Sequence, residues 1–368
     1  MDPKPAVHIR RPVSTYRIVQ IILGIIFSGY LLWRLYQVFI AHPAYGPDTW
    51  LRFSIDGIVL GSVYALIAIG YTLVYGILFM INFAHGDIMM IGAFGGYFVF
   101  EALGNIKVGS ATTPDLTFLN AHPAISVVLA FLVGALIAST SGYFLEKIAY
   151  RPLRSAPRLV PLISAIGASI FLENAGQLMF GAQRRDYSNP TTLERGTGWG
   201  IPIGGHTVIL TYTGVLTIIA SVLIMVGLYV LVRRTRLGRS MRAVAENKSV
   251  AALMGIDVDG VISRTFIISG ALAGAAGVMW GIHLGLVYYY VGFIPGIKAF
   301  TAAVLGGIGS IPGAMIGGVF LGVVEALGPA VLGISFQLKD VIAFSILVLV
   351  LIFRPTGILG EVLSEEKV

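Results

Sequence analysis

The chain has 368 residues, of which 56% are hydrophobic and only 12% are charged, and its formal net charge is +7. Soluble domains carry about a quarter charged residues, so this composition excludes an ordinary soluble core and predicts an all-α polytopic membrane protein. The positive charges lie in loops and termini rather than on one stripe, which argues against nucleic-acid binding. Cysteine is absent and the six histidines show no ligand spacing, so we expect no disulfide and no metal site.

Residues 1–52 are expected to hold a basic N-terminus and an extra transmembrane anchor. The apolar run at 18–40 is long enough to span a bilayer. It is too long for the core of a signal peptide, and no A-x-A cleavage pattern follows it. The basic residues before the run place the N-terminus in the cytoplasm by the positive-inside bias.

Further apolar runs recur along the chain, most of them near the twenty residues that a bilayer requires. The expected spans cover 53–79, 87–103, 125–144, 159–180, 208–232, 261–286, 313–332 and 341–353. With the anchor, they make about nine full transmembrane helices. The span 261–286, the seventh when the anchor is counted, contains the small-residue pairs Gly270/Gly274 and Gly277/Gly281, which predict close helix packing. The polar stretch 182–206 is expected to be a periplasmic loop, whereas the basic loop 233–260 is expected to be cytoplasmic.

The stretch between the seventh and eighth full spans alternates short apolar runs with glycine and proline. It predicts a short segment at 298–308 that turns at 309–312 into the next span. Irregular backbone at membrane depth survives only where protein or a watery cavity surrounds it, so Gly307 and Gly309 are candidate pathway residues. The pattern leaves open whether the short segment crosses the membrane or re-enters it.

The sequence INFAHGD at 81–87 joins the second and third full spans. Asn82 and Asp87 are natural capping residues, and Gly86 permits a tight turn. His85 is compatible with a proton relay, but a histidine at a helix junction more often satisfies backbone groups.

Two buried carboxylates are the other polar candidates inside the spans. Glu173, followed by Asn174, and Glu325 each lie about fourteen residues, roughly 21 Å, beyond the inner end of an outward-going helix. We therefore expect the two carboxylates to share a depth in the outer third of the membrane, where they can line an external vestibule. The alternative is that each one bonds a neighbouring helix.

The loop 233–260 follows a long apolar run but has a pattern of its own. Residues 240–254 are mostly good helix formers, Met241, Val244, Ala245 and Leu253 recur at roughly helical spacing, and Gly255 supplies a stop. Small alanines leave a slim helix that fits a groove on another protein. The alternative is an interfacial helix lying on anionic lipid.

Catalytic motifs are absent. No Gly-Lys pair occurs anywhere, so the chain lacks the P-loop that cradles nucleotide phosphates. No combination of serine, histidine and aspartate has a credible scaffold either. We expect a non-catalytic chain without a cofactor.

Several runs resemble one known family. They are GSVYALIAIGYTLVYGILFMINFAHGDIMMIGA, AYRPLR with LISAIGASIFLEN, GRSMRAVAENKSVAALMGI, KAFTAAVLGGIGSIPGAMIGG, EALG and PTGILG. Over about 53–360 the chain resembles the LivH-type permease of bacterial branched-chain amino acid ABC importers. The resemblance implies the ABC importer permease fold for 53–360, followed by a charged tail at 361–368. It also implies a multi-pass protein of the bacterial inner membrane, surrounded by membrane lipid.

The resemblance further implies a heteromeric importer. Its other parts are a second, LivM-like permease that forms a heterodimer with this chain, two cytoplasmic LivG/LivF-like ATPases and a periplasmic amino-acid-binding protein. The loop 233–260 then carries the helix that docks on the ATPase. The expected contact residues are Arg239, Arg242, Glu246, Ala251, Ala252, Leu253 and Gly255.

Two other functions stay open from the sequence. A permease for urea or short-chain amides resembles this family closely, and the chain itself does not separate it from an amino acid permease. An ion-coupled secondary transporter requires carboxylates near the midplane of the membrane. Glu173 and Glu325 are expected to lie too far outward for that role.

Overall fold

The computed structural model describes residues 15–41, 45–109, 115–154, 156–157, 159–354 and 356–360. The basic residues 1–14 and the tail 361–368 lie outside this described part. Within it, nine helices are long and apolar enough to cross a membrane, and a further apolar helix, Phe293–Gly306, is shorter. The predicted all-α polytopic chain with nine spans and one short segment is confirmed.

The helices are named in chain order. They are α1 (Thr15–Tyr36), α2 (Pro47–Leu78), α3 (His85–Gly104), α4 (Phe118–Ala121), α5 (Pro123–Leu145), α6 (Leu159–Phe180), α7 (Tyr212–Arg234), α8 (Arg236–Glu246), α9 (Lys248–Leu253), α10 (Val258–Leu284), α11 (Phe293–Gly306), α12 (Ile311–Leu332) and α13 (Lys339–Phe353). Two short antiparallel strand pairs complete the list: β1 (Arg185–Asp186) with β4 (Leu286–Val287), and β2 (Gly198–Ile203) with β3 (His206–Thr211).

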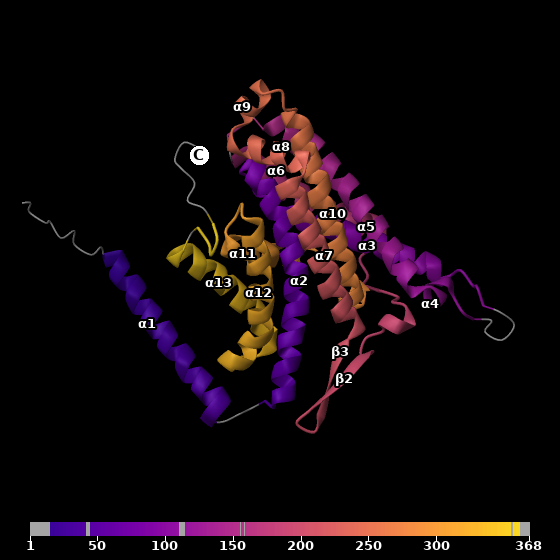
Figure 1. Cartoon of the computed structure of the whole chain (residues 1–368), viewed down its shortest axis with the longest axis vertical. Coiled ribbons are helices and arrows are strands. Elements are labelled where there is room, and N and C mark those ends of the chain that lie inside the picture. The colour runs from indigo at the N-terminus through magenta and orange to yellow at the C-terminus, as the bar shows by residue number, and fades with distance from the viewer. Residues whose placement is uncertain are drawn as a thin grey trace, which may run out of the picture.

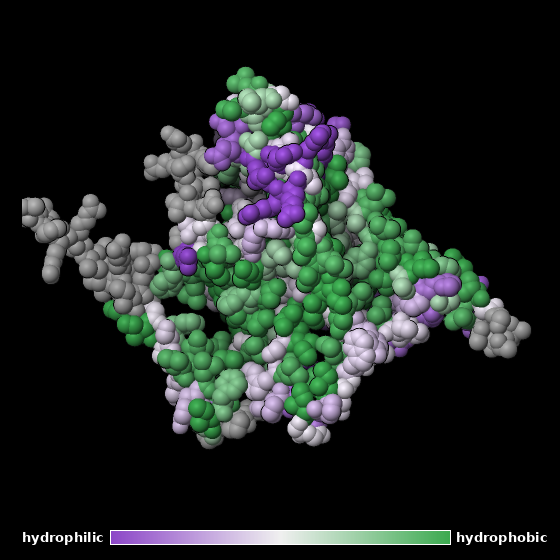
Figure 2. Space-filling view, viewed as in Figure 1, coloured by the Kyte–Doolittle hydropathy of each residue, from purple (hydrophilic) through white to green (hydrophobic). Residues whose placement is uncertain are grey.

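The long helices run roughly along one direction (Figure 1). The helices α8 and α9 lie at one end of this bundle, which we call the α8–α9 end, and the β2–β3 hairpin lies at the other. Figure 2 shows a hydrophobic belt around the middle and a concentration of hydrophilic residues near the α8–α9 end. The belt has the character of a surface in contact with lipid tails.

The helices α2 and α10 form the centre of the bundle. In the most apolar window of each, 89% and 83% of the residues are buried, whereas the corresponding figure for α7 is 22%. By contrast, α1 stands apart from the bundle (Figure 1), and only 6% of its window is buried. The Arg34 side chain links α1 to α12 by donating to the Val331 carbonyl, at 3.3 Å. The expected anchor is therefore a peripheral helix.

Glycines set the closest helix contacts. A Cβ at Gly61 in α2 would lie 2.7 Å from the Cα of Val319 in α12, which no real side chain tolerates. Between α10 and α5, a Cβ at Gly270 would lie 2.6 Å from the Ala138 carbonyl oxygen, and one at Gly274 would lie 2.5 Å from that of Gly134. The prediction of close packing from the paired glycines of α10 is confirmed, and backbones meet directly at these points.

One predicted span starts later in the structure than expected, because its first residues belong to the β2–β3 hairpin. The sixth full span was expected to begin at about residue 208, but residues 206–211 belong to β3 and α7 begins at Tyr212. Gly204 and Gly205 both have positive φ, which suits a two-residue hairpin turn. The Thr211 hydroxyl then caps α7 by accepting from the Gly214 N–H, at 3.2 Å. Apolar residues of β3 had extended the span pattern beyond the helix.

The short helix α11 and the non-helical segment before it carry the chain from β4 to the start of α12. It follows β4, which pairs with β1 next to the end of α6, and it ends at Gly306 near the start of α12. Fourteen residues of helix cover only about 21 Å. The remaining distance is covered by non-helical backbone, which packs at Gly292 against the Gly86 carbonyl inside the protein. At Gly292 the irregular backbone is therefore packed against protein, as the membrane interior requires.

We predict that Gly61→Ala will lower the thermal stability of the purified chain, because its new Cβ overlaps the α12 backbone. Overpacking of this kind costs about 1–3 kcal/mol. The matched control is Gly167→Ala in α6, where a Cβ meets nothing within 4 Å. The control should retain or gain stability, because alanine favours a helix over glycine. Equal melting temperatures for the two variants in detergent would contradict the packing assigned to Gly61.

Candidate functional site at the α8–α9 end

The loop between α7 and α10 folds into two short helices. The Thr235 hydroxyl caps α8 by accepting from the Gly238 N–H, at 3.1 Å. One helix over 240–254 was expected, but Asn247 divides it: its backbone is extended and its side chain accepts from the Val250 N–H, at 3.0 Å, to start α9. An asparagine favours this local bond over the interior of a helix. The single predicted helix is thus corrected to the pair α8 and α9.

Helix α9 ends in a tight, hydrogen-bonded turn at Gly255. Gly255 has a φ of +80°, its N–H bonds to the Ala252 carbonyl, and the Ile256 N–H bonds to the Ala251 carbonyl, both at 3.0 Å. This pair of bonds is the Schellman motif, in which glycine supplies the left-handed residue. The prediction that Gly255 ends the helix is confirmed.

The tip of the loop presents apolar side chains to its surroundings. Leu253 is 86% exposed, Met254 is 77% exposed and Val250 is 52% exposed, whereas Ala251 is buried beneath them. These three exposed residues are called the apolar tip. Figure 2 shows hydrophobic atoms at the extremity of the α8–α9 end, beyond the hydrophilic residues. Exposed apolar residues that stand clear of the rest of the protein are typical of a docking surface.

An ionic network fixes the base of the tip. Asp259 near the start of α10 accepts from both Arg151 and Arg154, in the segment that joins α5 to α6. Arg154 also pairs with Glu146, which is fully buried and accepts from the Ser263 hydroxyl at 2.7 Å. The connection between α9 and α10 is therefore tied to the neighbouring loop. The sequence run AYRPLR contains Arg151 and Arg154, but no pattern in the sequence predicted that they pair with Asp259 and Glu146.

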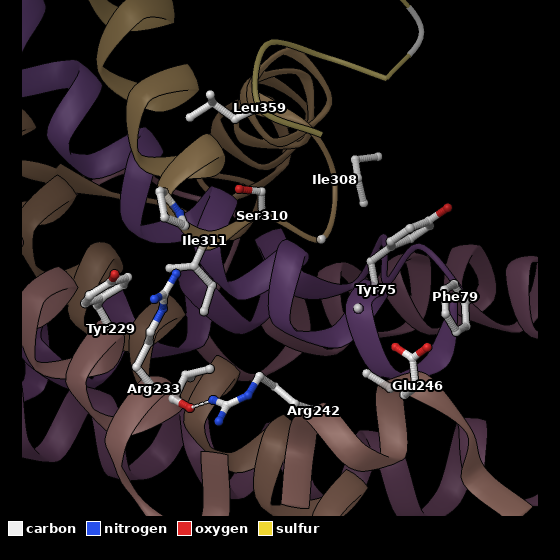
Figure 3. A pocket seen from close by; sticks show the side chains of 15 residues that line it. Tyr75, Phe79, Tyr229, Arg233, Arg242, Glu246, Ile308, Ser310, Ile311 and Leu359 are labelled. Carbon is white, nitrogen blue, oxygen red and sulfur yellow. Dashed lines mark hydrogen bonds between the residues drawn. The ribbon is translucent and has the colours of Figure 1, made fainter. Parts of the chain in front are cut away.

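A pocket of about 680 Å³ opens beside α8 (Figure 3). It is lined by Tyr75, Gly76, Phe79, Tyr229, Val232, Arg233, Arg242, Ala245, Glu246, Ile308, Gly309, Ser310, Ile311, Pro312 and Leu359. The Arg242 guanidinium donates to the Val232 carbonyl at the end of α7, as the dashed line in Figure 3 shows. The Arg233 guanidinium stacks over the Tyr229 ring at 5.3 Å.

The structure divides the predicted ATPase-contact residues into three groups, the third of which is Ala251 alone, whose side chain is buried. Arg242 and Glu246 line the pocket, together with the candidate pathway residue Gly309. The remaining exposed members of the contact set are Arg239, Ala252, Leu253 and Gly255, and none of them lines the pocket. The other candidate pathway glycine, Gly307, packs against Gly360 instead.

Glu325 lies in a buried ionic cluster rather than beside Glu173. Its carboxylate is 1% exposed, accepts from the Tyr64 hydroxyl at 3.0 Å and pairs with the Lys298 ammonium at 2.7 Å. Lys298 also lies 2.5 Å from Asp340. This cluster joins α2, α11, α12 and α13, so the geometry favours the role of bonding neighbouring helices. Lys298 stands alone in a run rich in glycine and alanine, and this was the signal that it has a partner.

Glu173 and Asn174 lie in α6, on the other side of the bundle interior. Glu173 is half-buried and close enough to Asp87 of α3 for their charges to interact. The Asn174 side chain donates to the Ile170 carbonyl of its own helix, at 2.7 Å. Among the residues that the structure describes, no hydrogen bond or salt bridge joins Glu173 to Glu325.

The INFAHGD segment is buried and bonded to other helices. Asn82 accepts from the Tyr150 hydroxyl at 2.6 Å, and Asp87 accepts from the Ser169 hydroxyl at 2.5 Å. Neither residue caps α3, whose N-cap is Ala84 without a side-chain bond. The expectation of capping was wrong, because the distant hydroxyls of Tyr150, in the connection between α5 and α6, and of Ser169, in α6, outcompete the local N–H groups.

We predict that Lys298→Met will destabilise the chain by about 3 kcal/mol, because it removes the buried cation of the Glu325 carboxylate and leaves only the half-exposed Lys339 ammonium, 3.4 Å away. The double variant Lys298→Met with Glu325→Met should recover part of this loss. The control is Lys107→Met, which removes a pair whose side chains are 66% and 88% exposed, and which should change stability by about 1 kcal/mol or less. Thermal unfolding in detergent compares them, and an additive double variant would argue against a coupled pair.

Comparison with known proteins identifies the family. A family model described as "Branched-chain amino acid transport system / permease component" matches residues 53–351. The chain is 45% identical over 312 residues to the high-affinity branched-chain amino acid transport system permease protein BraD of Pseudomonas aeruginosa, which covers 85% of this chain and 96% of BraD. It is 46% identical over 317 residues to the corresponding protein LivH of Escherichia coli K12, over 84% of this chain and 96% of LivH.

A more distant relative shares the same extent. The probable branched-chain amino acid transport permease protein LivH of Methanocaldococcus jannaschii is 27% identical over 82% of this chain and 90% of its own length. No solved structure gives a significant match. The family model spans most of the bundle, and the relatives cover nearly their whole length. The chain is a multi-pass membrane protein that belongs to the permease-component family of branched-chain amino acid transport systems.

Proposed function

We propose that the chain is the non-catalytic permease subunit of an ATP-driven importer of branched-chain amino acids. The names of BraD and LivH support this solute over urea or short amides, because both are described as branched-chain amino acid permeases. The absence of a Gly-Lys pair supports ATP hydrolysis by separate subunits. The proposed partners are a LivM-like permease, two cytoplasmic LivG/LivF-like ATPases and a periplasmic amino-acid-binding protein, around a chain of the inner membrane with a cytoplasmic N-terminus.

The apolar tip of Val250, Leu253 and Met254 is the observation that carries this proposal. The Leu253 side chain is 86% exposed, and this exposure contributes nothing to the stability of the isolated chain. Burying a side chain of this size in a partner's groove contributes about 1.5–3 kcal/mol. The slim helix, with Ala252 and Gly255 at its surface, permits close approach, and Arg239 lies exposed on the adjoining helix. We propose that this tip docks on an ATPase subunit.

The contacts at the base of the apolar tip connect α9 mechanically to α10. Ala251 is buried against the rest of the protein, and Asp257 caps α10 by accepting from the Gly260 N–H at 3.0 Å. Asp259 then holds α10 to Arg151 and Arg154. A tilt of α9 therefore turns α10, which packs at its glycines against α5. Close-packed helices transmit such a movement because they shift as rigid bodies.

The interrupted segment between α11 and α12 is our proposed pathway element. Gly307 and Gly309 have φ values of +105° and +95°, so the chain turns there in a conformation that other residues resist. The α12 helix then starts at a Ser310 cap, whose hydroxyl accepts from the Gly313 N–H at 3.2 Å. Glu173 and Asn174, on the opposite side of the interior, are further candidates. Glu325 serves mainly to hold the helices that flank this element.

We predict that Leu253→Asp will abolish co-purification of the ATPase subunits with the membrane-inserted chain. The carboxylate would have to enter an apolar groove without a partner, and Ala252→Arg should act likewise by size and charge. The control is His206→Asp in the hairpin at the opposite end of the bundle, which should leave co-purification unchanged. Normal ATPase recovery with Leu253→Asp would remove the tip from the interface.

We also predict ATP-dependent uptake of leucine, isoleucine and valine by vesicles that contain the complete co-expressed system. Radiolabelled urea and acetamide should not accumulate above the level of vesicles lacking ATP. Accumulation of an amide, but not of leucine, would replace the solute in this proposal. Uphill movement driven by the purified chain alone would overturn the ATP-driven class.

A further inference from the structure

The pocket beside α8 has the size and chemistry of a small-molecule site. Its volume of about 680 Å³ falls within the range of roughly 300–1,000 Å³ that is usual for ligand pockets. Its wall also combines charged, aromatic and aliphatic side chains in separate places. Neither the docking of the tip nor the packing of the bundle requires such an arrangement.

We propose that this pocket binds a free L-α-amino acid with an aliphatic side chain, in its zwitterionic form. The inference rests on the proposed function, which puts the α8–α9 end in the cytoplasm and makes the ligand the imported solute. The site is therefore an inner binding site on the permease itself, separate from recognition by a periplasmic receptor.

Charges of both signs lie on one face of α8. Arg242 and Glu246 are four residues apart, and such residues on a helix have Cβ atoms about 5–6 Å apart on the same side. Figure 3 shows both residues on the α8 side of the pocket, with Arg233 of α7 close to Arg242. The two charged ends reach different parts of the pocket, with the Arg242 guanidinium directed at Val232 and the Glu246 carboxylate lying toward Phe79 (Figure 3). The wall therefore offers a cation for the carboxylate of an α-amino acid and, at a separate place, an anion for its ammonium.

The net charge of this wall fits the carboxylate end. Two guanidinium groups, those of Arg233 and Arg242, face one carboxylate, that of Glu246. The Arg242 guanidinium uses one nitrogen to donate to the Val232 carbonyl, which orients the group and leaves its other N–H donors for a ligand. A planar guanidinium held in this way is suited to a carboxylate.

The opposite wall is apolar. Ile308 comes from the turn before α12, Ile311 and Pro312 begin α12, and Leu359 lies in the segment after α13; Figure 3 shows Ile308 and Leu359 across the pocket from Arg242 and Glu246, with Ile311 beside Arg233. Phe79 and Tyr75 close one side from the end of α2. An aliphatic side chain would lie against this wall while its charged end faces α8. The same ligand would thus connect α8 to the glycine turn before α12.

Binding of L-leucine to the full-length chain in lipid nanodiscs, without the ATPases, tests this inference by isothermal titration calorimetry. We expect saturable binding, weakened at least about tenfold by Glu246→Gln and by Arg242→Gln, since each removes a charge-assisted contact. The matched control is Arg236→Gln, on the same helix but outside the pocket and outside the predicted ATPase-contact set, which should bind as the unchanged chain does. Leucinamide, which lacks the carboxylate, and 4-methylpentanoate, which lacks the ammonium, should both bind at least about tenfold more weakly.

Two results would overturn the inner site. One is the absence of saturable L-leucine binding to the unchanged chain, and the other is equal binding by the Glu246→Gln and Arg242→Gln variants with their fold intact by thermal unfolding. Either result alongside ATP-dependent leucine uptake by the complete system would reject the inner site and leave the proposed function standing. Binding by the chain with no uptake by the complete system would reject the proposed function instead.

Discussion

Direct contact between helix backbones is the constraint on which the structure depends. In lipid no hydrophobic force draws helices together, so association rests on close van der Waals packing. Glycines at Gly61, Gly270 and Gly274 allow α12 to approach α2, and α5 to approach α10, without side chains between them. Such a bundle has little freedom to deform internally, and movement imposed at one end is carried to the other.

We propose that the α8–α9 end passes movement of a partner into this rigid bundle. The apolar tip reaches away from the bundle, while Asp259, Arg151 and Arg154 hold its base to two neighbouring segments. The pocket lies directly beside this base, between α8 and the turn before α12. The proposed ATPase docking surface and the proposed inner ligand site thus share one small region, in which both partners would contact the same helix.

The sequence predicted most of the architecture, because apolar runs of fixed length leave few alternatives in a bilayer. It misplaced the start of α7, where apolar residues of a hairpin strand extend the run, and it merged α8 with α9 across Asn247. Residue types alone identified Glu325 but not Lys298 as its partner, since a pairing across 27 positions is set by packing. The pocket also escaped detection, because it is assembled from five segments: the end of α2, α7, α8, residues 308–312 and the segment after α13.

The exposure of the tip on the cytoplasmic side is the central claim, and impermeant thiol labelling tests it directly. The natural chain has no cysteine, so Leu253→Cys provides a unique site. We predict that a membrane-impermeant maleimide labels this site in inside-out vesicles but not in right-side-out vesicles, and that bound ATPases protect it. Labelling from the outer side, or unchanged labelling after the ATPases bind, would contradict the account.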